Sequence, residues 1–368
     1  MSASKSTVVV TGVAGNLGLR LLGQLQDFSV IGLDLVQPAV STLDRFEQVD
    51  LGQESSCAQL VGLLKETRAS AVVHLAFVID PVRTGILDVG RMWQINVAGT
   101  ARVMEAIAEV NRMGGAVRKL IIPGSVSAYG PDLPGQVNES FPLRAHTLPY
   151  AIHKRESDEV VRVRAKQLAS CTTFLLRAHI FAGATMQNYL IGALRGTPTG
   201  GGVVAAKLRK RGARLPLLIP YGSRYLRSRL QFVHVDDVAR LIAFILRDER
   251  RHDSPTVINV AGRGEAVTTQ ECISLAHAKS LRLPGKWLCR AVLAMLWKLG
   301  ISGVPSEALP YMIGSYLVNT AKLREFLGRD YENVIRYTVR EALADSFVPE
   351  ALPAMQSAHA ITRSAATK

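Results

Sequence analysis

Short apolar runs alternate with longer amphipathic segments through the first half of the chain. The runs are rich in β-branched residues and read as buried strands: TVVVTG (7–12), SVIGLD (29–34), AVVHLAF (71–77), KLIIPGS (119–125) and TTFLLRA (172–178). Apolar positions recur at helical spacing between them, over residues 16–27, 56–68, 89–112 and 150–169. Strands that alternate with helices predict an α/β fold, in which a doubly wound parallel sheet carries helices on both faces.

A glycine-rich turn follows the first predicted strand. In TGVAGNLG, Gly12, Gly15 and Gly18 are spaced by three, and a helical pattern opens at Asn16 and Leu17. Such glycines allow a tight turn and close approach of a pyrophosphate, which the helix N-terminus attracts. This is the sequence pattern of a Rossmann dinucleotide site.

An acidic residue closes the second predicted strand, about twenty residues after the glycines. Asp34 is placed there to accept hydrogen bonds from the adenosine ribose, and it repels the additional phosphate of NADP. We therefore predict that NAD is the cofactor. Asp50 and Leu51, in FEQVDLGQ, follow another short extended run and are predicted to contact the adenine.

The segment YAIHK carries the candidate catalytic groups. Tyr150 and Lys154 lie four residues apart at the start of a helix opened by Pro149, so both side chains project from one face. The lysine ammonium is expected to lower the pKa of the tyrosine and to hold the nicotinamide ribose. Ser125, at the end of a predicted strand, is expected to hydrogen-bond the reacting oxygen. These residues predict hydride transfer at a carbon bearing a hydroxyl group.

The alternation of strands and helices breaks after about residue 181, where glycine, proline and basic residues become frequent. It returns at LQFVHVDDVARLIAFIL and at TVINVAG. We therefore expect an NAD-binding domain over residues 1–180, which the chain rejoins at about 229–262. Residues 181–228 and 263–350 form a smaller substrate-binding domain in this interpretation, and 351–368 a frayed tail.

The cysteine content and the N-terminal sequence indicate the cellular environment of the protein. The four cysteines (57, 171, 272 and 289) form no CxxC pair, so neither a disulfide framework nor a zinc site is expected, and no metal site is predicted. The apolar run at the N-terminus is too short for a signal peptide. A reducing, cytoplasmic location fits these features.

The formal charge of +14 points to an acidic partner. This partner could be a diphosphate ligand, an anionic membrane surface or nucleic acid, and the charge alone does not distinguish among the three. The densest basic stretch, residues 207–214, reads most simply as a solvated surface, and nucleic-acid binding is not expected.

Residues 7–330 resemble the NAD-dependent epimerase/dehydratase family, the extended short-chain dehydrogenases/reductases. The motifs that carry the resemblance are TGVAGNLG, HLAF, NVAGT, SVSAYG, YAIHK, LLRAHIFAG and FVHVDDVA. The resemblance implies that Ser125, Tyr150 and Lys154 form a catalytic triad and that the protein is a homodimer. It also implies that further residues line or support the cofactor cleft: Leu75, Ala76, Phe77, Asn96, Arg177 and His179. His74 and His234 are expected to be structural.

Departures from the family pattern bear on the substrate. Sugar dehydratases carry an Asp-Glu pair after the catalytic hydroxyl residue, where this chain has Val126 and Ser127, so dehydration is not expected. Nucleotide-sugar epimerases commonly place a diphosphate-binding arginine four residues before the histidine of the HVDD motif. Leu230 stands there, with Arg229 one position earlier, which puts a nucleotide-sugar substrate in doubt.

The segment KWLCRAVLAMLWKLG suggests a different substrate class. It presents a wide apolar band beside three basic residues, Lys286, Arg290 and Lys298. The band comprises Trp287, Leu288, Val292, Met295, Trp297 and Leu299. A core or lid helix explains it, as does a wall for a sterol-like or acyl substrate, or a helix lying on an acidic membrane surface.

Three hypotheses about function therefore stand. The first is an NAD-dependent dehydrogenase or epimerase that acts on a nucleotide-sugar or on a hydrophobic hydroxy compound. The second is an oxidoreductase similar to the 3β-hydroxysteroid dehydrogenases. The third is a non-catalytic, NAD-binding regulatory protein, although such a protein has no need of Tyr150 as a proton donor.

Overall fold

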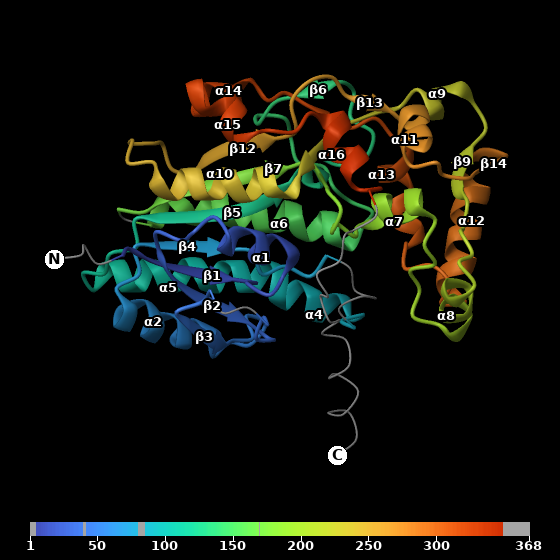
Figure 1. Cartoon of the computed structure of the whole chain (residues 1–368). Helices are drawn as coiled ribbons and strands as arrows, with labels where there is room; N and C mark the ends of the chain where they lie inside the picture. Colours follow the sequence, from blue (N-terminus) through green and yellow to red (C-terminus); the bar gives the residue numbers. More distant parts are fainter. Residues whose placement is uncertain (1–4, 40–41, 80–84, 169, 349–368) are drawn as a thin grey trace, which may run out of the picture.

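The computed structural model describes residues 5–39, 42–79, 85–168 and 170–348. The predicted tail over residues 351–368 and the last residue of the predicted helix 150–169 lie outside these ranges. A parallel sheet of seven strands organises the first domain, in the order β12-β7-β5-β4-β1-β2-β3 (Figure 1). Its strands are β1 (Thr7–Thr11), β2 (Ser29–Asp34), β3 (Arg45–Gln48), β4 (Ala71–His74), β5 (Lys119–Ser125), β7 (Thr172–Ala178) and β12 (Thr256–Val260).

Helices cover both faces of this sheet, which confirms the predicted α/β doubly wound fold. One face carries α1 (Asn16–Leu22) and α10 (Val235–Arg247), and the other carries α2 (Ser56–Thr67), α5 (Gly99–Arg112) and α6 (Pro149–Arg164). In β1, Val8 and Val10 pack toward the first face and Val9 toward the second. Burial on both faces explains why the strands are continuously apolar.

Two predicted helices differ in detail. The first ends at Leu22, five residues earlier than expected, with Gly23 as its C-cap. The predicted helix 89–112 is divided into α4 (Val89–Trp93), the π-helical turn η1 (Gln94–Ala98) and α5. The π turn carries Asn96, and such turns are common at functional sites.

Shorter elements form the rest of the molecule. Helices and helical turns are η2 (Val126–Tyr129), η3 (Ala165–Gln167), α7 (Tyr189–Arg195), α8 (Val203–Lys210), α9 (Ser223–Leu226), α11 (Thr269–Leu275), α12 (Gly285–Lys298), η4 (Ser306–Ala308), α13 (Leu309–Ile313), α14 (Ala321–Leu327), η5 (Gly328–Asp330), α15 (Tyr331–Val334) and α16 (Val339–Asp345). Strands are β6 (Gln136–Val137), β8 (Ile180–Ala182), β9 (Leu217–Pro220), β10 (Arg229–Leu230), β11 (Phe232–His234), β13 (Val267–Thr268), β14 (Ser280–Leu283) and β15 (Leu317–Val318).

These elements lie mostly beyond the carboxyl ends of the sheet strands. The helices α7, α8, α12 and α13 gather there, on the right of Figure 1. By contrast, α14 and α15 pack against β12 and α10, so residues 321–334 lie with the sheet rather than with α11 and α12. The predicted domain boundaries stay a prediction. They assign residues 321–334 to the substrate-binding domain, whereas these residues pack against the sheet domain.

The described part of the chain contains no helix that is both long enough and apolar enough to cross a membrane. Its histidine, cysteine and carboxylate side chains also form no group of three or more that is placed to hold a metal ion.

Candidate active site

Close packing around the turn between β1 and α1 requires glycine at two of its positions. Gly12 has φ +69°, and a Cβ there would lie 2.5 Å from the amide nitrogen of Ala76. A Cβ at Gly18 would lie 2.4 Å from the carbonyl oxygen of Val13. At Gly15, the N-cap of α1, the only close atom would be the Gly12 carbonyl oxygen at 3.2 Å. Two glycines therefore allow the backbones to meet, and Gly15 leaves room on the outer side of the turn.

The neighbours of the turn link it to both sides of the cleft. The Asn16 side chain donates to the carbonyl oxygen of Thr185 at 3.2 Å, from the segment after β8. Leu17, the next residue, packs at the edge of the core beneath α1. The loop after β8 thus lies against the start of α1.

Asp34 ends β2 beside the glycine turn. Its carboxylate accepts hydrogen bonds from the amides of Ala14 at 2.9 Å and Leu35 at 2.7 Å. Burial raises its pKa, and the backbone amides oppose that rise. The carboxylate is thereby fixed at the strand end, where a ribose hydroxyl would meet it.

Asp50 and Leu51 follow β3. One Asp50 carboxylate oxygen accepts from the amide of Gly52 at 2.9 Å, and the other forms an ion pair with Arg91. Leu51 is buried under α5. Arg91 therefore belongs to the same site edge, although the sequence did not single it out.

Asn96 holds the loop that leaves β4. Its amide group both accepts from the Val78 amide, at 2.7 Å, and donates to the Val78 carbonyl oxygen, at 3.0 Å. This pair of hydrogen bonds fixes the backbone after Leu75, Ala76 and Phe77. Asn96 is itself fully buried, so it positions the loop rather than lining the cleft.

Ser125, Ser127 and Tyr150 form a cluster of hydroxyl groups at the carboxyl end of β5. The Ser125 hydroxyl accepts from the amide of Ser127 at 3.1 Å and from the Ser127 hydroxyl at 2.9 Å. Both serines hydrogen-bond Tyr150, in the first turn of α6, and these contacts lower its pKa, but burial has the larger effect and raises it. The lowered pKa expected from the sequence is thus not what this arrangement gives.

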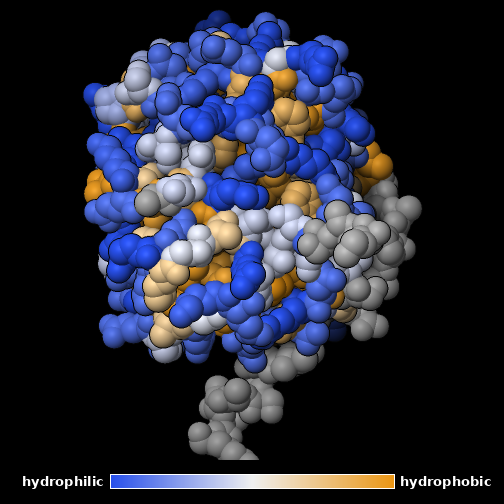
Figure 2. Space-filling view, turned by 90° about the vertical axis from the view of Figure 1, so that its left-hand side faces the viewer, coloured by the Kyte–Doolittle hydropathy of each residue, from blue (hydrophilic) through white to orange (hydrophobic). Residues whose placement is uncertain are grey.

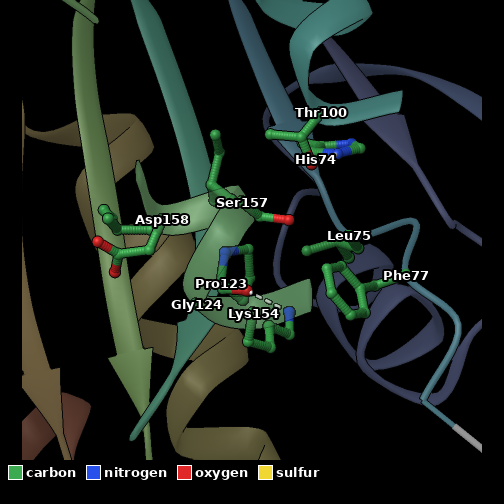
Figure 3. Close-up of a pocket in the computed structure, with 11 residues that line it drawn as sticks. His74, Leu75, Phe77, Thr100, Pro123, Gly124, Lys154, Ser157 and Asp158 are labelled. Carbon is green, nitrogen blue, oxygen red and sulfur yellow. Dashed lines mark hydrogen bonds between the residues drawn. The ribbon is translucent and has the colours of Figure 1, made fainter. Parts of the chain in front are cut away.

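Lys154 lies one helical turn after Tyr150 and is buried. Figure 3 shows its side chain between Pro123 and Phe77. Its ammonium donates to the carbonyl oxygen of Pro123 at 2.9 Å and lies 3.6 Å from the ring centroid of Phe77. The Phe77 ring in turn meets Tyr150 edge-on, with centroids 5.9 Å apart. Burial lowers the pKa of Lys154 to about 7, so its charge is unusually easy to remove.

Arg177 supports the site from behind. Its guanidinium binds the Asp158 carboxylate through two nitrogens, at 2.7 and 2.9 Å, and a third nitrogen donates to Tyr129 and to the carbonyl oxygen of Glu139. Asp158 lies one turn after Lys154 on α6, and its carboxylate points away from Lys154 in Figure 3. The ion pair therefore fixes α6 against β7, and Arg177 does not face the cleft.

The buried histidines are held by their neighbours. His74 contacts the hydroxyls of Thr11 at 2.8 Å and Thr100 at 3.1 Å, and burial lowers its pKa to about 3. His179 contacts the Tyr316 carbonyl oxygen at 3.1 Å, and burial likewise lowers its pKa to about 3. His234 caps α10 and stacks on Tyr337. All three bridge elements of the fold.

Comparison with known proteins identifies the family. The sequence pattern of the NAD-dependent epimerase/dehydratase family matches residues 8–261. This chain belongs to that family.

A related curated protein is a UDP-glucose 4-epimerase from Erwinia amylovora. It is 27% identical over 184 residues, which cover 46% of this chain and 52% of the relative. The match therefore spans about half the length of that protein.

Solved structures share the fold of this family member. MoeE5, with UDP-glucuronic acid and NAD, aligns at 22% identity and a TM-score of 0.61, over 93% of this chain and 98% of MoeE5. A UDP-glucuronic acid 4-epimerase from Bacillus cereus, with NAD, aligns at 18% identity and a TM-score of 0.62, over 93% of this chain and 97% of the epimerase. A UDP-glucose 4-epimerase from Thermus thermophilus, with NAD, aligns at 20% identity and a TM-score of 0.63, over 93% of this chain and 98% of the epimerase.

The predicted cofactor is confirmed, because the family uses NAD and the turn fits it. Gly12 and Gly18 admit no side chain, Gly15 leaves the turn open, and Asp34 is held at the strand end. The prediction of an NAD-dependent enzyme is confirmed with it.

Besides Arg91, three further features of this epimerase/dehydratase site were not predicted. Ser127 joins Ser125 and Tyr150, and its spacing of two from Ser125 in a tight turn was the available signal. Asp158 pairs with Arg177, and only its i+4 position from Lys154 hinted at a role. The Phe77 ring lies over the Lys154 ammonium, which no spacing in the sequence indicates.

Proposed function

We propose that this protein catalyses NAD-dependent hydride transfer at a carbon that bears a secondary hydroxyl group. The observation that carries the proposal is the convergence of Ser125, Tyr150 and Lys154 at the carboxyl end of β5. In open α/β sheets, ligands bind at the carboxyl ends of the strands. The glycine turn between β1 and α1 lies at the corresponding end of β1, which is separated from β5 by the single strand β4.

In this proposal each side chain has a separate task. Tyr150 exchanges the proton of the substrate hydroxyl, and Ser125 holds the same oxygen by a hydrogen bond. Ser127 supports Ser125 through its own hydroxyl at 2.9 Å. Lys154 binds the nicotinamide ribose and, when charged, stabilises the phenolate. NAD bound on the glycine turn would supply the hydride acceptor.

The raised pKa of Tyr150 affects which direction of the reaction, carbonyl reduction or alcohol oxidation, the resting site favours. Burial keeps the phenol protonated at neutral pH, which suits it to donate a proton to a carbonyl oxygen. Oxidation of an alcohol needs the phenolate, which a charged Lys154 favours. The pKa of Lys154, about 7, lets the lysine gain or lose that charge near neutrality.

The related curated protein supports a nucleotide-sugar epimerase as the particular reaction. In such a reaction, Tyr150 removes a hydroxyl proton as hydride leaves the same carbon, giving a keto group. After the sugar turns over, hydride returns to the opposite face of that carbon and Tyr150 returns the proton. Both chemical steps use one set of residues, and the cofactor ends the cycle unchanged.

A hydrophobic hydroxy compound is the second candidate substrate, and one observation favours it. Leu230 is buried in β10, while Arg229 points to the surface and pairs with Glu265 at 3.0 Å. The position at which epimerases commonly carry a diphosphate-binding arginine therefore holds a buried apolar side chain and no cation. A substrate without a diphosphate, similar to those of 3β-hydroxysteroid dehydrogenases, needs no such arginine.

One panel of assays tests the proposal and separates the two reactions. The full chain is incubated with NAD and either UDP-sugars or hydroxysteroids, while NADH absorbance and product epimers are followed. Net NADH indicates a dehydrogenase, and a new epimer without net NADH indicates an epimerase. Tyr150→Phe should lower turnover by about a thousandfold and leave NAD affinity unchanged, and Tyr221→Phe, on the surface, should change neither.

A protein that binds NAD but turns over no compound of this panel, and whose function in cells is unchanged by Tyr150→Phe, would instead be a non-catalytic NAD-binding regulator. The predicted homodimer stays a prediction that sedimentation of the purified chain can test.

A further inference from the structure

The positive charge of this protein is concentrated in two segments. Residues 197–227 and 279–304 contain twelve lysine and arginine residues and no aspartate or glutamate. The remainder of the chain is almost balanced, with thirty-two basic and thirty acidic residues. These segments therefore account for nearly the whole formal charge of +14, and we call them the outer lobe.

The two segments of the outer lobe fold against each other. Strands β9 and β14 pair in parallel, with Leu217 opposite Ser280, and α12 packs on β9. The amide of Gly202 donates to the carbonyl oxygen of Gly300 at 2.9 Å, which brings the start of α8 to the end of α12. In Figure 1 the lobe forms the end of the molecule opposite the N-terminus.

Large apolar side chains are exposed on this lobe. On α12, Trp287 is 71% exposed and Met295 53%, and Leu299, the C-cap of the helix, is 56% exposed. With Ala291 these residues recur every four positions, so they form one exposed stripe. Cys289 and Leu293, on the opposite side of the helix, are the ones that are buried. The helix thus packs with one face and leaves a second apolar face uncovered by the described residues.

The apolar surface continues onto α8. Val203 and Val204 are 72% and 48% exposed, and they directly follow Gly202, which bonds to Gly300. Exposed basic side chains accompany both helices: Lys207, Lys210 and Arg211 on and after α8, and Lys286, Arg290 and Lys298 on α12. The lobe thus combines exposed apolar side chains with basic side chains that form no ion pair with the described acidic residues.

The opposite end of the molecule looks different. Figure 2 shows that polar residues cover most of that face and that its apolar residues appear as small, separate spots. A contiguous apolar surface that lacks a polar cover marks an interaction site on a protein.

We propose that the outer lobe docks on an anionic phospholipid membrane surface. Trp287, Met295 and Leu299 enter the boundary between headgroups and acyl chains, and the basic side chains bind the lipid phosphates. Nucleic acid would satisfy the charge but not the exposed tryptophan and leucine. A second copy of the lobe would cover the apolar stripe but would bring two strongly positive surfaces together. An anionic membrane complements both features at once.

Vesicle co-sedimentation of the full chain tests this proposal, with vesicles of phosphatidylcholine alone and of phosphatidylcholine with phosphatidylglycerol. We expect binding to the anionic vesicles only, weakened by added salt. Lys207→Gln, Lys210→Gln and Arg211→Gln together should weaken it about a hundredfold, at about fivefold per charge. Trp287→Ser with Leu299→Ser should weaken it about tenfold or more.

Matched variants on the sheet domain are the controls. Lys65→Gln, Arg112→Gln and Lys166→Gln remove three exposed charges from α2, α5 and η3, and Leu87→Ser removes an exposed apolar side chain. Both sets should leave vesicle binding unchanged. Lipids brominated on the acyl chains add a direct readout, because they should quench the fluorescence of Trp287, and Trp287→Phe should remove most of that quenching whereas Trp93→Phe should not.

Several outcomes overturn the proposal. Equal binding to neutral and anionic vesicles, or no binding, excludes it. Equal losses in the outer-lobe and control variants show a general charge effect and exclude it too. Tighter binding to duplex DNA than to anionic vesicles assigns the lobe to nucleic acid. Dimerisation without lipid that Trp287→Ser abolishes assigns the stripe to a second copy of the chain. None of these results depends on the proposed reaction.

Discussion

The candidate active site and the outer lobe use the same charged residue types in opposite ways. Arg177 is 2% exposed and has its guanidinium bound by a carboxylate, a phenol and a carbonyl group. The outer lobe keeps its twelve basic residues without one acidic residue of its own. Burial makes a partner obligatory in the first region, whereas water solvates the charges in the second. The buried Arg177 therefore stabilises the fold around the site. The solvated basic residues of the outer lobe remain available to bind an external anion.

Removal of Asp158 should have the largest effect on stability. Asp158→Ala leaves the buried Arg177 without its carboxylate, and we expect a loss of about 3 to 5 kcal/mol in the free energy of unfolding. Urea unfolding measures it. The double variant Asp158→Leu with Arg177→Met should recover most of the loss, since an apolar pair leaves no charge unpaired.

An exposed ion pair provides the control for Asp158. Asp27 and Arg247 pair at the surface, with side chains 52% and 44% exposed. Asp27→Ala should cost less than about 1 kcal/mol. Similar losses for the two aspartate variants would contradict the distinction between buried and solvated charges.

A side chain at Gly12 should be the next most damaging change. In Gly12→Ala, the new Cβ meets the Ala76 amide nitrogen at 2.5 Å on a backbone with φ +69°. We expect a loss of about 2 to 3 kcal/mol in stability and at least about tenfold in NAD affinity by calorimetry. Gly62→Ala, on α2 with open space around it, should instead stabilise the protein by about 0.5 to 1 kcal/mol.

Lys154 should make stability depend on pH. Its pKa in the folded protein is about 7 because it is buried, whereas an unfolded lysine titrates near about 10.4. Between these values the unfolded chain binds more protons, so the stability from this group rises with pH and is lost as pH falls to about 7. From pH 7 to about pH 9, wild type should gain about 2 kcal/mol relative to Lys154→Met.

Urea titrations at the two pH values test this expectation, with exposed Lys65→Met as the control that keeps the wild-type slope. Parallel pH profiles for wild type and Lys154→Met would show that the lysine stays charged in the folded protein.

Loss of charge from the outer lobe should have the smallest effect on the isolated protein. Lys207→Gln, Lys210→Gln and Arg211→Gln remove exposed charges that no acidic residue of the lobe neutralises. The melting temperature should stay within about 2 °C of wild type, or rise slightly as repulsion falls. A large fall, seen by scanning fluorimetry, would mean that these residues stabilise the fold rather than serve a partner.

Much of the sheet domain could be read from local pattern. All five predicted strands are present, because strands buried on both faces must be continuously apolar. Gly12, Gly15, Gly18 and Asp34 were recognisable because their spacing follows from one strand-turn-helix unit. The early end of α1 was missed although Gly23, its C-cap, is a local stop signal. The π turn at Asn96 was missed because no local spacing marks it.

The α12 helix shows the limit of that reasoning. Its apolar band allowed a core helix, a substrate wall or a membrane-facing helix, and periodicity cannot choose among faces that are all apolar. The structure buries Cys289 and Leu293 and leaves Trp287, Met295 and Leu299 exposed. Exposure is decided by neighbours in the fold, here above all β9, which lies more than sixty residues earlier in the chain.

The amino-acid sequence by itself determined the α/β class, the NAD turn and the tyrosine and lysine on one helix face, because each depends on residues close together in the chain. Only the tertiary structure decided that Ser127 joins Tyr150, that Asp158 holds Arg177, and that Phe77 covers Lys154. It also gathered the basic segments into one lobe. Contacts between distant segments, and the burial that shifts each pKa, arise only when the chain packs.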